Sequence, residues 1–280
     1  MKTVSAIISM SRPINCFITF VTIIVACLIC SNTFDNFLYV LVGGIIGVFV
    51  AASGNIINDY YDVEADRINR PSRVLPLELV SPKVAVIIYL FFSVVALALS
   101  MLLGFELFVI TAITILLLFL YSYKFKNIPL LGNLVVAFLT GLAFIFGSII
   151  VGNVFCGVFP AMFAFIINFM RELVKDIEDI DGDRTVGLST YPIEFGVVNS
   201  VNIITFSGIA LILLTILPFI LDIYNIKYFI VIIIFVDGII IFVISRLRSD
   251  PSSYNLKLSS NLLKIDMAIG IIAIILGSKF

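Results

Sequence analysis

Two acidic segments carry carboxylates at the spacing of one helical face. In NDYYDVEAD, Asn58, Asp62 and Asp66 lie four residues apart, with Asp59 close to the same face. In RELVKDIEDIDGDR the acids fall at positions i, i+4, i+7 and i+11, namely Glu172, Asp176, Asp179 and Asp183. Side chains at these intervals project from one side of a helix. Each segment therefore predicts a stripe of carboxylates, and Gly182 predicts where the second helix loosens or ends.

The chemistry of these stripes is limited by the residue types that surround them. The chain has no His, so His-ligated zinc, haem held by His and Ser-His-Asp hydrolysis are excluded. Crowded carboxylates at a low-dielectric boundary need cations to neutralise them. A ligand set made only of oxygens suits Mg2+, which binds one or two carboxylates together with waters and substrate phosphates. Two facing stripes therefore predict a site for two or more Mg2+ ions and a diphosphate.

Basic residues lie beside both acidic segments. Those that flank the stripes or fill the short segment between them are Arg67, Arg70, Arg73, Lys124, Lys126, Lys175 and Arg184. Acids and bases mixed within short loops are typical of a metal-phosphate site. The bases are equally well explained by membrane topology, and the alternative for the acids is a pair of ordinary solvated loops. Helical spacing at the ends of apolar segments favours the metal site for the acids.

The elements that must position these residues are membrane helices. Hydrophobic residues make up 61% of the 280-residue chain and charged residues 12%, about half the charged share of a soluble domain. A span needs about 20 mostly apolar residues, and nine segments qualify: 14–30, 37–57, 83–103, 105–123, 129–150, 154–170, 199–221, 227–246 and 262–278. The polar segments 58–82 and 171–198 interrupt them, and 246–261 is a milder third interruption.

The predicted fold class is an all-α polytopic membrane protein with nine transmembrane helices in a bundle. Residues 1–280 are expected to form a single domain. One acidic segment follows the second span and the other follows the sixth, four spans later, which predicts a faint four-helix internal repeat. With the N-terminus in the cytoplasm, fifteen Lys and Arg lie on the cytoplasmic side, and only Lys227 and Lys279 lie outside. Cytoplasmic loops carry such an excess. The chain is therefore expected in the cell membrane, with both acidic segments cytoplasmic.

Two features inside the spans have simpler explanations than chemistry. Cys27-Leu-Ile-Cys30 has CxxC spacing, but it lies in an apolar run without a second pair, so packing is the favoured interpretation. Asp237 lies in the middle of the eighth span, where an acid is a functional candidate by default. We expect it to make a polar contact between helices, with a functional role as the alternative.

The two acidic motifs resemble those of the UbiA superfamily of intramembrane prenyltransferases. The matching residues are Asn58-x-x-x-Asp62-x-x-x-Asp66 continuing into RINRPSR, Asp179-x-x-x-Asp183, the spacer YSYKFKNIPLLGN and Arg12-Pro-x-Asn15. The resemblance covers most of the chain. It implies nine helices around a central cavity that opens sideways to lipid. It also implies Mg2+-dependent transfer of a prenyl group from its diphosphate to an acceptor.

The resemblance also implies roles for individual residues. The implied catalytic positions are Asn58, Asp62, Asp66, Asp179 and Asp183, and the four acids among them, joined by Asp176, are the expected metal ligands. The expected substrate-binding residues are Arg12, Asn15, Arg67, Arg70, Arg73, Tyr121, Lys124, Lys126 and Lys175. Tyr121 would stabilise a carbocation with its ring, and interfacial anchoring is its alternative role. Without His, a carboxylate or the departing diphosphate must take the proton of the acceptor.

Among the branches of that family, the chain is most similar to the archaeal lipid branch, by NDYYDVEADRINRPSR and RELVKDIEDIDGDR. This implies transfer of a geranylgeranyl group to the hydroxyl of geranylgeranylglyceryl phosphate, which forms the second ether bond of archaeal membrane lipids. The alternatives are prenylation of an aromatic acceptor of the quinone, haem or chlorophyll pathways and, in a different class, a secondary transporter. The expected partners are a prenyl diphosphate, a lipid-like acceptor and the bilayer. No protein partner is implied, and a net charge of -1 does not suggest a nucleic-acid surface.

Overall fold

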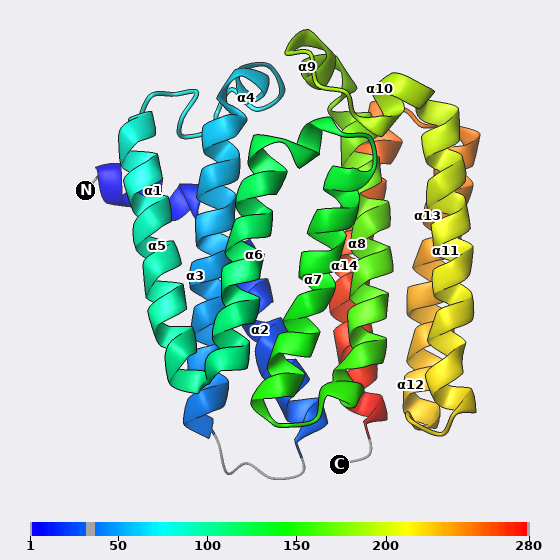
Figure 1. The fold of residues 1–280 in the computed structure, drawn as a ribbon. Helices are drawn as coiled ribbons and strands as arrows, with labels where there is room; N and C mark the ends of the chain where they lie inside the picture. Colours follow the sequence, from blue (N-terminus) through cyan, green and yellow to red (C-terminus); the bar gives the residue numbers. More distant parts are fainter. Residues whose placement is uncertain (1, 32–36, 279–280) are drawn as a thin grey trace.

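A computed structural model describes residues 2–31 and 37–278, and every regular element within these ranges is helical (Figure 1). Lys279, which entered the charge count, lies outside the described residues. The longer helices are α1 (Lys2–Met10), α2 (Pro13–Cys30), α3 (Phe37–Tyr61), α5 (Pro82–Leu103), α6 (Phe105–Tyr123), α7 (Leu131–Ile150), α8 (Val158–Glu178), α11 (Val197–Ile220), α13 (Asp237–Ser249) and α14 (Ser253–Gly277). The shorter helices are α4 (Val63–Asn69), α9 (Ile180–Thr185), α10 (Tyr191–Phe195) and α12 (Ile226–Val231).

Nine helical segments in the described part of the chain are long and apolar enough to cross a membrane. Two of them combine several elements: a 3-10 turn at Val154–Gly157 leads into α8, and α12 continues through a π-helical turn at Ile232–Val236 into α13. Each predicted span is confirmed, but two helices are longer than predicted. The sixth continues past residue 170 to Glu178, and the ninth begins at Ser253 instead of 262. Their polar extensions are covered by neighbouring helices, so composition alone does not mark them as helix.

The long helices stand side by side and form a bundle, with α4, α9 and α10 together at one end (Figure 1). One hydrophobic cluster lies mainly among α8, α11, α13 and α14, with Met170, Leu211 and Leu263 at its centre. A second lies mainly among α2, α3, α5 and α6, with Ile46 and Ile56 at its centre. The bundle thus has two apolar halves, and each half contributes one acidic motif.

Glycine brings helices close together where the halves meet. At Gly147 of α7, a Cβ atom would lie 2.7 Å from the Ile23 carbonyl oxygen and 2.7 Å from the Ala26 Cβ of α2. Such distances are shorter than van der Waals contact, so only a residue without a side chain lets these two backbones approach. The α2–α7 contact therefore depends on Gly147.

The cysteines correct one prediction. Cys30 forms a disulfide with Cys156, with the Cα atoms 5.4 Å apart, so the packing interpretation is wrong for Cys30. Packing is correct for Cys27, which is buried and donates its thiol to the Gly147 carbonyl at 3.2 Å. The two bonded cysteines are 126 residues apart, and pairing over such a separation cannot be deduced from spacing. The bond links the C-terminal end of α2 to the turn that precedes α8.

Polar groups within the spans contact one another. Asp237 accepts a hydrogen bond from Thr215 Oγ1 at 3.2 Å, which confirms the predicted polar contact between helices. Asp266 of α14 is fully buried nearby, and within residues 2–31 and 37–278 neither of its carboxylate oxygens has a hydrogen-bond partner. These acids lie in the half of the bundle built by α11 to α14.

Candidate active site

Both acidic stripes lie where a long helix ends and a short one begins. Asp62 separates α3 from α4, and Asp179 separates α8 from α9. The expectation of one continuous helix per stripe is therefore wrong at these two residues. The helical pattern of backbone bonds nevertheless runs across the first junction, since Asp62 N donates to Asn58 O at 2.9 Å and Asp66 N to Asp62 O at 2.8 Å. The motif spacing is kept, although the first stripe is interrupted at Asp62 and the second at Asp179.

Gly182 is not a helix end but a packing position inside α9. A Cβ atom there would lie 2.0 Å from Asn69 Oδ1 at the end of α4. The two short helices carry the last acid of each motif, Asp66 and Asp183. They lie next to each other at one end of the bundle (Figure 1). The glycine therefore allows the two motifs to approach each other.

The first motif is held by basic and amide groups. Asp62 accepts from Lys126 Nζ at 2.7 Å and from Asn58 Nδ2 at 2.8 Å. Arg73 bonds both Asp66 and Asp59, the latter at 3.2 Å. The Asp62, Asp66 and Asp59 side chains are all more than nine-tenths buried. The predicted residues Lys126 and Arg73 therefore contact the first motif directly.

The second motif contacts the first. Arg70 donates to both carboxylate oxygens of Asp179, at 2.8 and 3.2 Å. Burial raises the pKa of Asp183 to about 6, the nearby Lys126 lowers it, and the carboxylates of Asp179 and Asp62 raise it further. The contact between the two motifs runs through the Arg70–Asp179 pair and the packing of α4 against α9.

Charge balance in this region favours ionised bases. Burial alone would lower the pKa of Lys126, but the adjacent Asp62 carboxylate raises it above the usual lysine value. Burial raises the pKa of Asp66, and the Arg73 guanidinium offsets part of that rise. Charge-assisted pairs of this kind are the stronger hydrogen bonds in proteins. Bases paired with site acids in this way can also bond to a phosphate oxygen.

A second group of predicted residues lies deeper along α8. Lys175 Nζ donates to both carboxylate oxygens of Glu172, at 2.8 and 3.0 Å. Asp176 on the same helix accepts from Asn133 Nδ2 of α7 at 2.8 Å. Tyr121 lies at the end of α6, close enough to Glu172, Asp62 and Asp176 to be affected by their charges. Tyr121 therefore lies within range of the charges on both acidic segments.

Three further predicted residues lie at the margins. Lys124 is exposed and lines a polar hollow of about 280 Å3 together with Asp62, Lys126 and Tyr61. Arg67 pairs with Glu64 at 3.0 Å on the surface, with about half of the Arg67 side chain exposed. In the described part of the chain, the Asn15 side chain makes no hydrogen bond. In the described part of the chain, Arg67 and Asn15 therefore make no hydrogen bond to a motif aspartate.

Arg12 joins the site by an unusual backbone conformation. It lies between α1 and α2 with φ 51° and ψ 73°, a left-handed conformation that is uncommon outside glycine. Its guanidinium bonds Asp59 of α3. Strained residues of this kind are concentrated at functional sites. The turn places a positive charge against the first motif.

The donor set fits Mg2+. Asn58 Oδ1 is buried and has no hydrogen-bond partner among the described residues, although Nδ2 of the same amide bonds Asp62. A buried oxygen without a donor, beside carboxylates, suits a hard cation with oxygen ligands. Within residues 2–31 and 37–278, no three acids are clustered so that they could hold a metal ion together. Each motif acid instead has a base nearby. Lys126 bonds Asp62 and its charge acts on Asp183, Arg73 bonds Asp66, and Arg70 bonds Asp179.

Sequence reasoning did not select four residues that the structure places here. They are Asp59, Asn133, Asn168 and Arg171, and Asn168 and Arg171 lie on α8 close to Glu172. Helical spacing carried a signal for two of them, because Asp59 lies near the face of the first stripe and Asn168 extends the second stripe into the sixth span. Asn133 is a polar side chain within an apolar span, which is itself a signal, and Arg171 carried none beyond its charge. Their partners are supplied by other helices or by adjacent side chains of α8.

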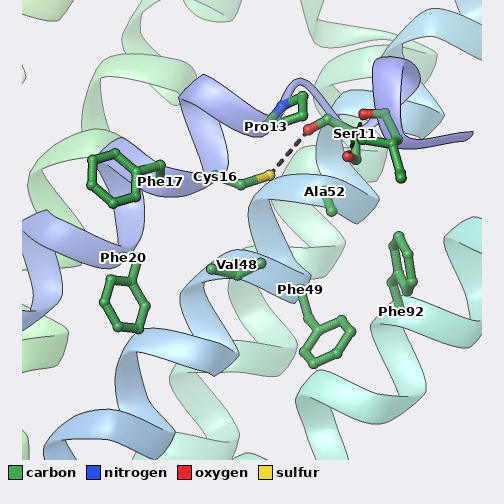
Figure 2. A pocket seen from close by; sticks show the side chains of 10 residues that line it. Ser11, Pro13, Cys16, Phe17, Phe20, Val48, Phe49, Ala52 and Phe92 are labelled. Carbon is green, nitrogen blue, oxygen red and sulfur yellow. Dashed lines mark hydrogen bonds between the residues drawn. The ribbon is translucent and has the colours of Figure 1, made fainter. Parts of the chain in front are cut away.

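An apolar hollow of about 350 Å3 is lined by Ser11 and Pro13, the two neighbours of Arg12 in the chain (Figure 2). Its walls include Phe17 and Phe20 of α2, Phe49 of α3 and Phe92 of α5. At its rim, the Cys16 thiol donates to the Ser11 carbonyl at 3.0 Å. A lining of aromatic rings with few polar atoms suits a hydrocarbon chain.

Comparison with known proteins gives a consistent result. The model of the UbiA prenyltransferase family matches residues 19–264. Digeranylgeranylglyceryl phosphate synthase of Thermococcus sibiricus is 36% identical over 271 residues, which cover 97% of this chain and 96% of the relative. The synthase of the same name from Methanocaldococcus jannaschii is 34% identical over 282 residues, covering 99% and 98%. The similarity therefore extends over both motifs and all nine candidate spans.

Solved structures agree with the sequence relatives. One is a structure of a digeranylgeranylglyceryl phosphate synthase in membranes. It has a TM-score of 0.82 and 33% identity over 99% of both chains. A UbiA homolog from Archaeoglobus fulgidus bound to GPP and Mg2+ has a TM-score of 0.67 and 17% identity, covering 96% of this chain and 99% of that chain. At that identity the second match establishes the fold alone.

Proposed function

Because the chain belongs to the UbiA prenyltransferase family, we propose that it transfers a geranylgeranyl group from geranylgeranyl diphosphate to the free hydroxyl of geranylgeranylglyceryl phosphate. The product would carry the second ether bond of an archaeal membrane lipid. The name shared by the relatives described above supports this acceptor. The observation that carries the reaction class is the meeting of both acidic motifs at one end of the bundle, where α4 packs against α9 and Arg70 pairs with Asp179.

The proposal assigns the donor diphosphate to the acidic end of the bundle. Asn58, Asp62, Asp66, Asp179 and Asp183 would hold Mg2+, and Asp176 would support them. Bound Mg2+ would neutralise charge on the departing diphosphate. Arg70, Arg73 and Lys126 already point at motif carboxylates. They would donate charge-assisted hydrogen bonds to phosphate oxygens and keep the leaving group oriented.

The remaining steps concern the prenyl cation and the acceptor. Breaking the allylic C–O bond leaves a delocalised cation, which aromatic rings stabilise when water is excluded. We assign this role to Tyr121, whose ring lies within range of the charges on both acidic segments. The acceptor hydroxyl oxygen then attacks the cation and loses its proton. Since the chain has no His, the departing diphosphate or a motif carboxylate takes that proton.

We propose that the acidic end of the bundle faces the cytoplasm. Fifteen of seventeen basic residues favour this orientation. The Cys30–Cys156 disulfide lies at the opposite end, and disulfides persist in oxidising environments outside the cytosol. In intact cells, a membrane-impermeant maleimide should label Lys227→Cys but not Lys257→Cys; both positions are exposed, and the free native cysteines are buried. The opposite labelling would reverse the orientation.

The acceptor is tested by product mass spectrometry. Purified protein is given geranylgeranyl diphosphate and Mg2+ with either geranylgeranylglyceryl phosphate or 4-hydroxybenzoate. We expect a diether phosphate with the first acceptor and no ring prenylation with the second. Excess chelator should abolish the product, and added Mg2+ should restore it. Prenylation of the aromatic ring alone would overturn the acceptor, and full activity in chelator would overturn the metal requirement.

A further inference from the structure

A basic cluster separate from the two aspartate motifs lies on α8. It consists of Arg171 and Lys175, both bonded to Glu172 at 3.0 Å or less. Two cations therefore bond a single carboxylate. A third, Arg12, pairs with Asp59 of α3, and its charge also acts on Glu172 and Lys175. Glu172 itself is buried, with 8% of its surface exposed.

Donors in this cluster lack acceptors. Arg171 Nε and Asn168 Nδ2 are both buried and have no hydrogen-bond partner in the described part of the chain. Asn168 lies one helical turn before Glu172, which lies three residues before Lys175, so these side chains share a face of α8. Buried donors without acceptors are rare because each loses its bonds to water. Two unpaired donors beside positively charged side chains indicate a missing ligand with a negative charge and several oxygen atoms.

This cluster differs in kind from the donor site. At the donor site, Arg70, Arg73 and Lys126 each pair with a motif aspartate, as expected where metal ions and a diphosphate meet. The α8 cluster contains no motif aspartate: Glu172 holds Arg171 and Lys175, and Asp59 holds Arg12. The Arg171, Lys175 and Arg12 side chains remain 23%, 29% and 29% exposed, so a ligand can reach them. Such a cluster suits an anion that binds without a metal ion.

We propose that Arg171, Lys175, Arg12 and Asn168 bind the phosphate of the acceptor, a glycerol ether lipid with a terminal phosphomonoester. The guanidinium groups match phosphate geometry with paired N–H donors, and Lys175 adds a point charge. Glu172 is a positioning residue that keeps Arg171 and Lys175 together. This inference rests on the proposed function and adds to it the residues that select a phosphorylated acceptor.

A chemical double-mutant cycle tests the inference. Wild type, Arg171→Gln and Lys175→Met are each assayed with geranylgeranylglyceryl phosphate and with the same lipid lacking phosphate. We expect the wild type to favour the phosphorylated acceptor by about 100-fold in kcat/KM, as removal of a bidentate charged contact does. Each variant should reduce that preference at least tenfold by raising the KM for the phosphorylated acceptor. The KM for geranylgeranyl diphosphate should stay within twofold.

The exposed cytoplasmic base Lys83 supplies a matched control, and Lys83→Met should leave the acceptor preference unchanged. A second measurement avoids turnover. In chelator and without donor, geranylgeranylglyceryl phosphate should raise the Tm of the wild type but not of Arg171→Gln. Equal losses with both acceptors, or a wild type indifferent to the phosphate, would overturn the inference while diether formation still supported the proposed function. Absence of any diether would overturn both.

Discussion

Folding disfavours the ionised form of the Asp183 carboxyl group. Burial raises its pKa from 3.8 to about 6, so the stability lost to ionisation accumulates as the pH rises through that interval and is complete above it. At pH 7.5, Asp183→Asn should therefore raise the stability of the metal-free protein, by roughly 3 kcal/mol. The same change removes a proposed metal ligand and should lower kcat/KM at least 100-fold. Thermal unfolding and product formation measure the two effects.

Glu64→Gln is the control for that prediction. Its side chain is 69% exposed and pairs with Arg67 on the surface, and such pairs contribute about 0–1 kcal/mol. Stability should change little in this variant. A less stable Asp183→Asn protein would show that the carboxylate contributes to folding, contrary to the electrostatic argument.

Lys126 should be more sensitive than a surface base. Lys126→Met leaves the buried Asp62 without its cation, and removing one partner of a buried pair costs about 3–5 kcal/mol. The side chain of Lys126 is still 21% exposed, so solvent screening reduces the expected loss to about 1–3 kcal/mol. Arg67→Met serves as the matched surface change and should alter stability by less than about 0.5 kcal/mol. Equal effects in denaturation would contradict the buried pairing.

At the residue scale, the sequence predicted the motif acids better than their partners. Helical spacing was enough to select Asp62, Asp179 and Asp183. The pairing of Arg70 with Asp179 joins residues 109 positions apart, and that of Lys126 with Asp62 joins residues 64 apart. Long-range pairs of this kind depend on helix packing, which periodicity does not encode. Arg171 could not be distinguished from the topological bases for the same reason.

At the level of elements, apolar length predicted all nine spans but not where the helices turn. The chain has no Pro or Gly at Asp62 or Asp179, so neither break carries a sequence signal. The early start of α14 was missed because Asn255, Ser259 and Ser260 are polar, yet all three are buried. Burial of polar residues against neighbouring helices cannot be read from composition. The four-helix repeat stays a prediction.

The α2–α7 contact provides an element-scale prediction. Gly147→Ala would place a methyl group 2.7 Å from a backbone oxygen of α2. Helices must then separate, and overpacking of this kind costs about 1–3 kcal/mol. Gly270→Ala in α14 is the control, since a Cβ atom there meets nothing within 4 Å. Thermal unfolding in detergent should separate the two, and equal stability would show that α2 adjusts without cost.

For the whole molecule, the disulfide should stabilise the assembled bundle. The Cys30–Cys156 bond closes a loop between residues 126 positions apart, and it constrains the unfolded chain. A native disulfide of this kind typically contributes about 2–4 kcal/mol to stability. Cys30→Ser and Cys156→Ser should lower stability equally, and the double variant should be no worse than either single one. A shift on non-reducing gels checks the bond itself. Additive losses would mean that the two sulfur atoms act independently.

The same bond restrains how α2 and α8 can move relative to each other. It joins the C-terminal end of α2 to the turn before α8, while Arg12 precedes the N-terminus of α2 and Glu172 lies in the last two turns of α8. The covalent link therefore fixes the distance between these helices at one end only. A change in the separation of Arg12 and Glu172 would require α2 and α8 to tilt about the disulfide.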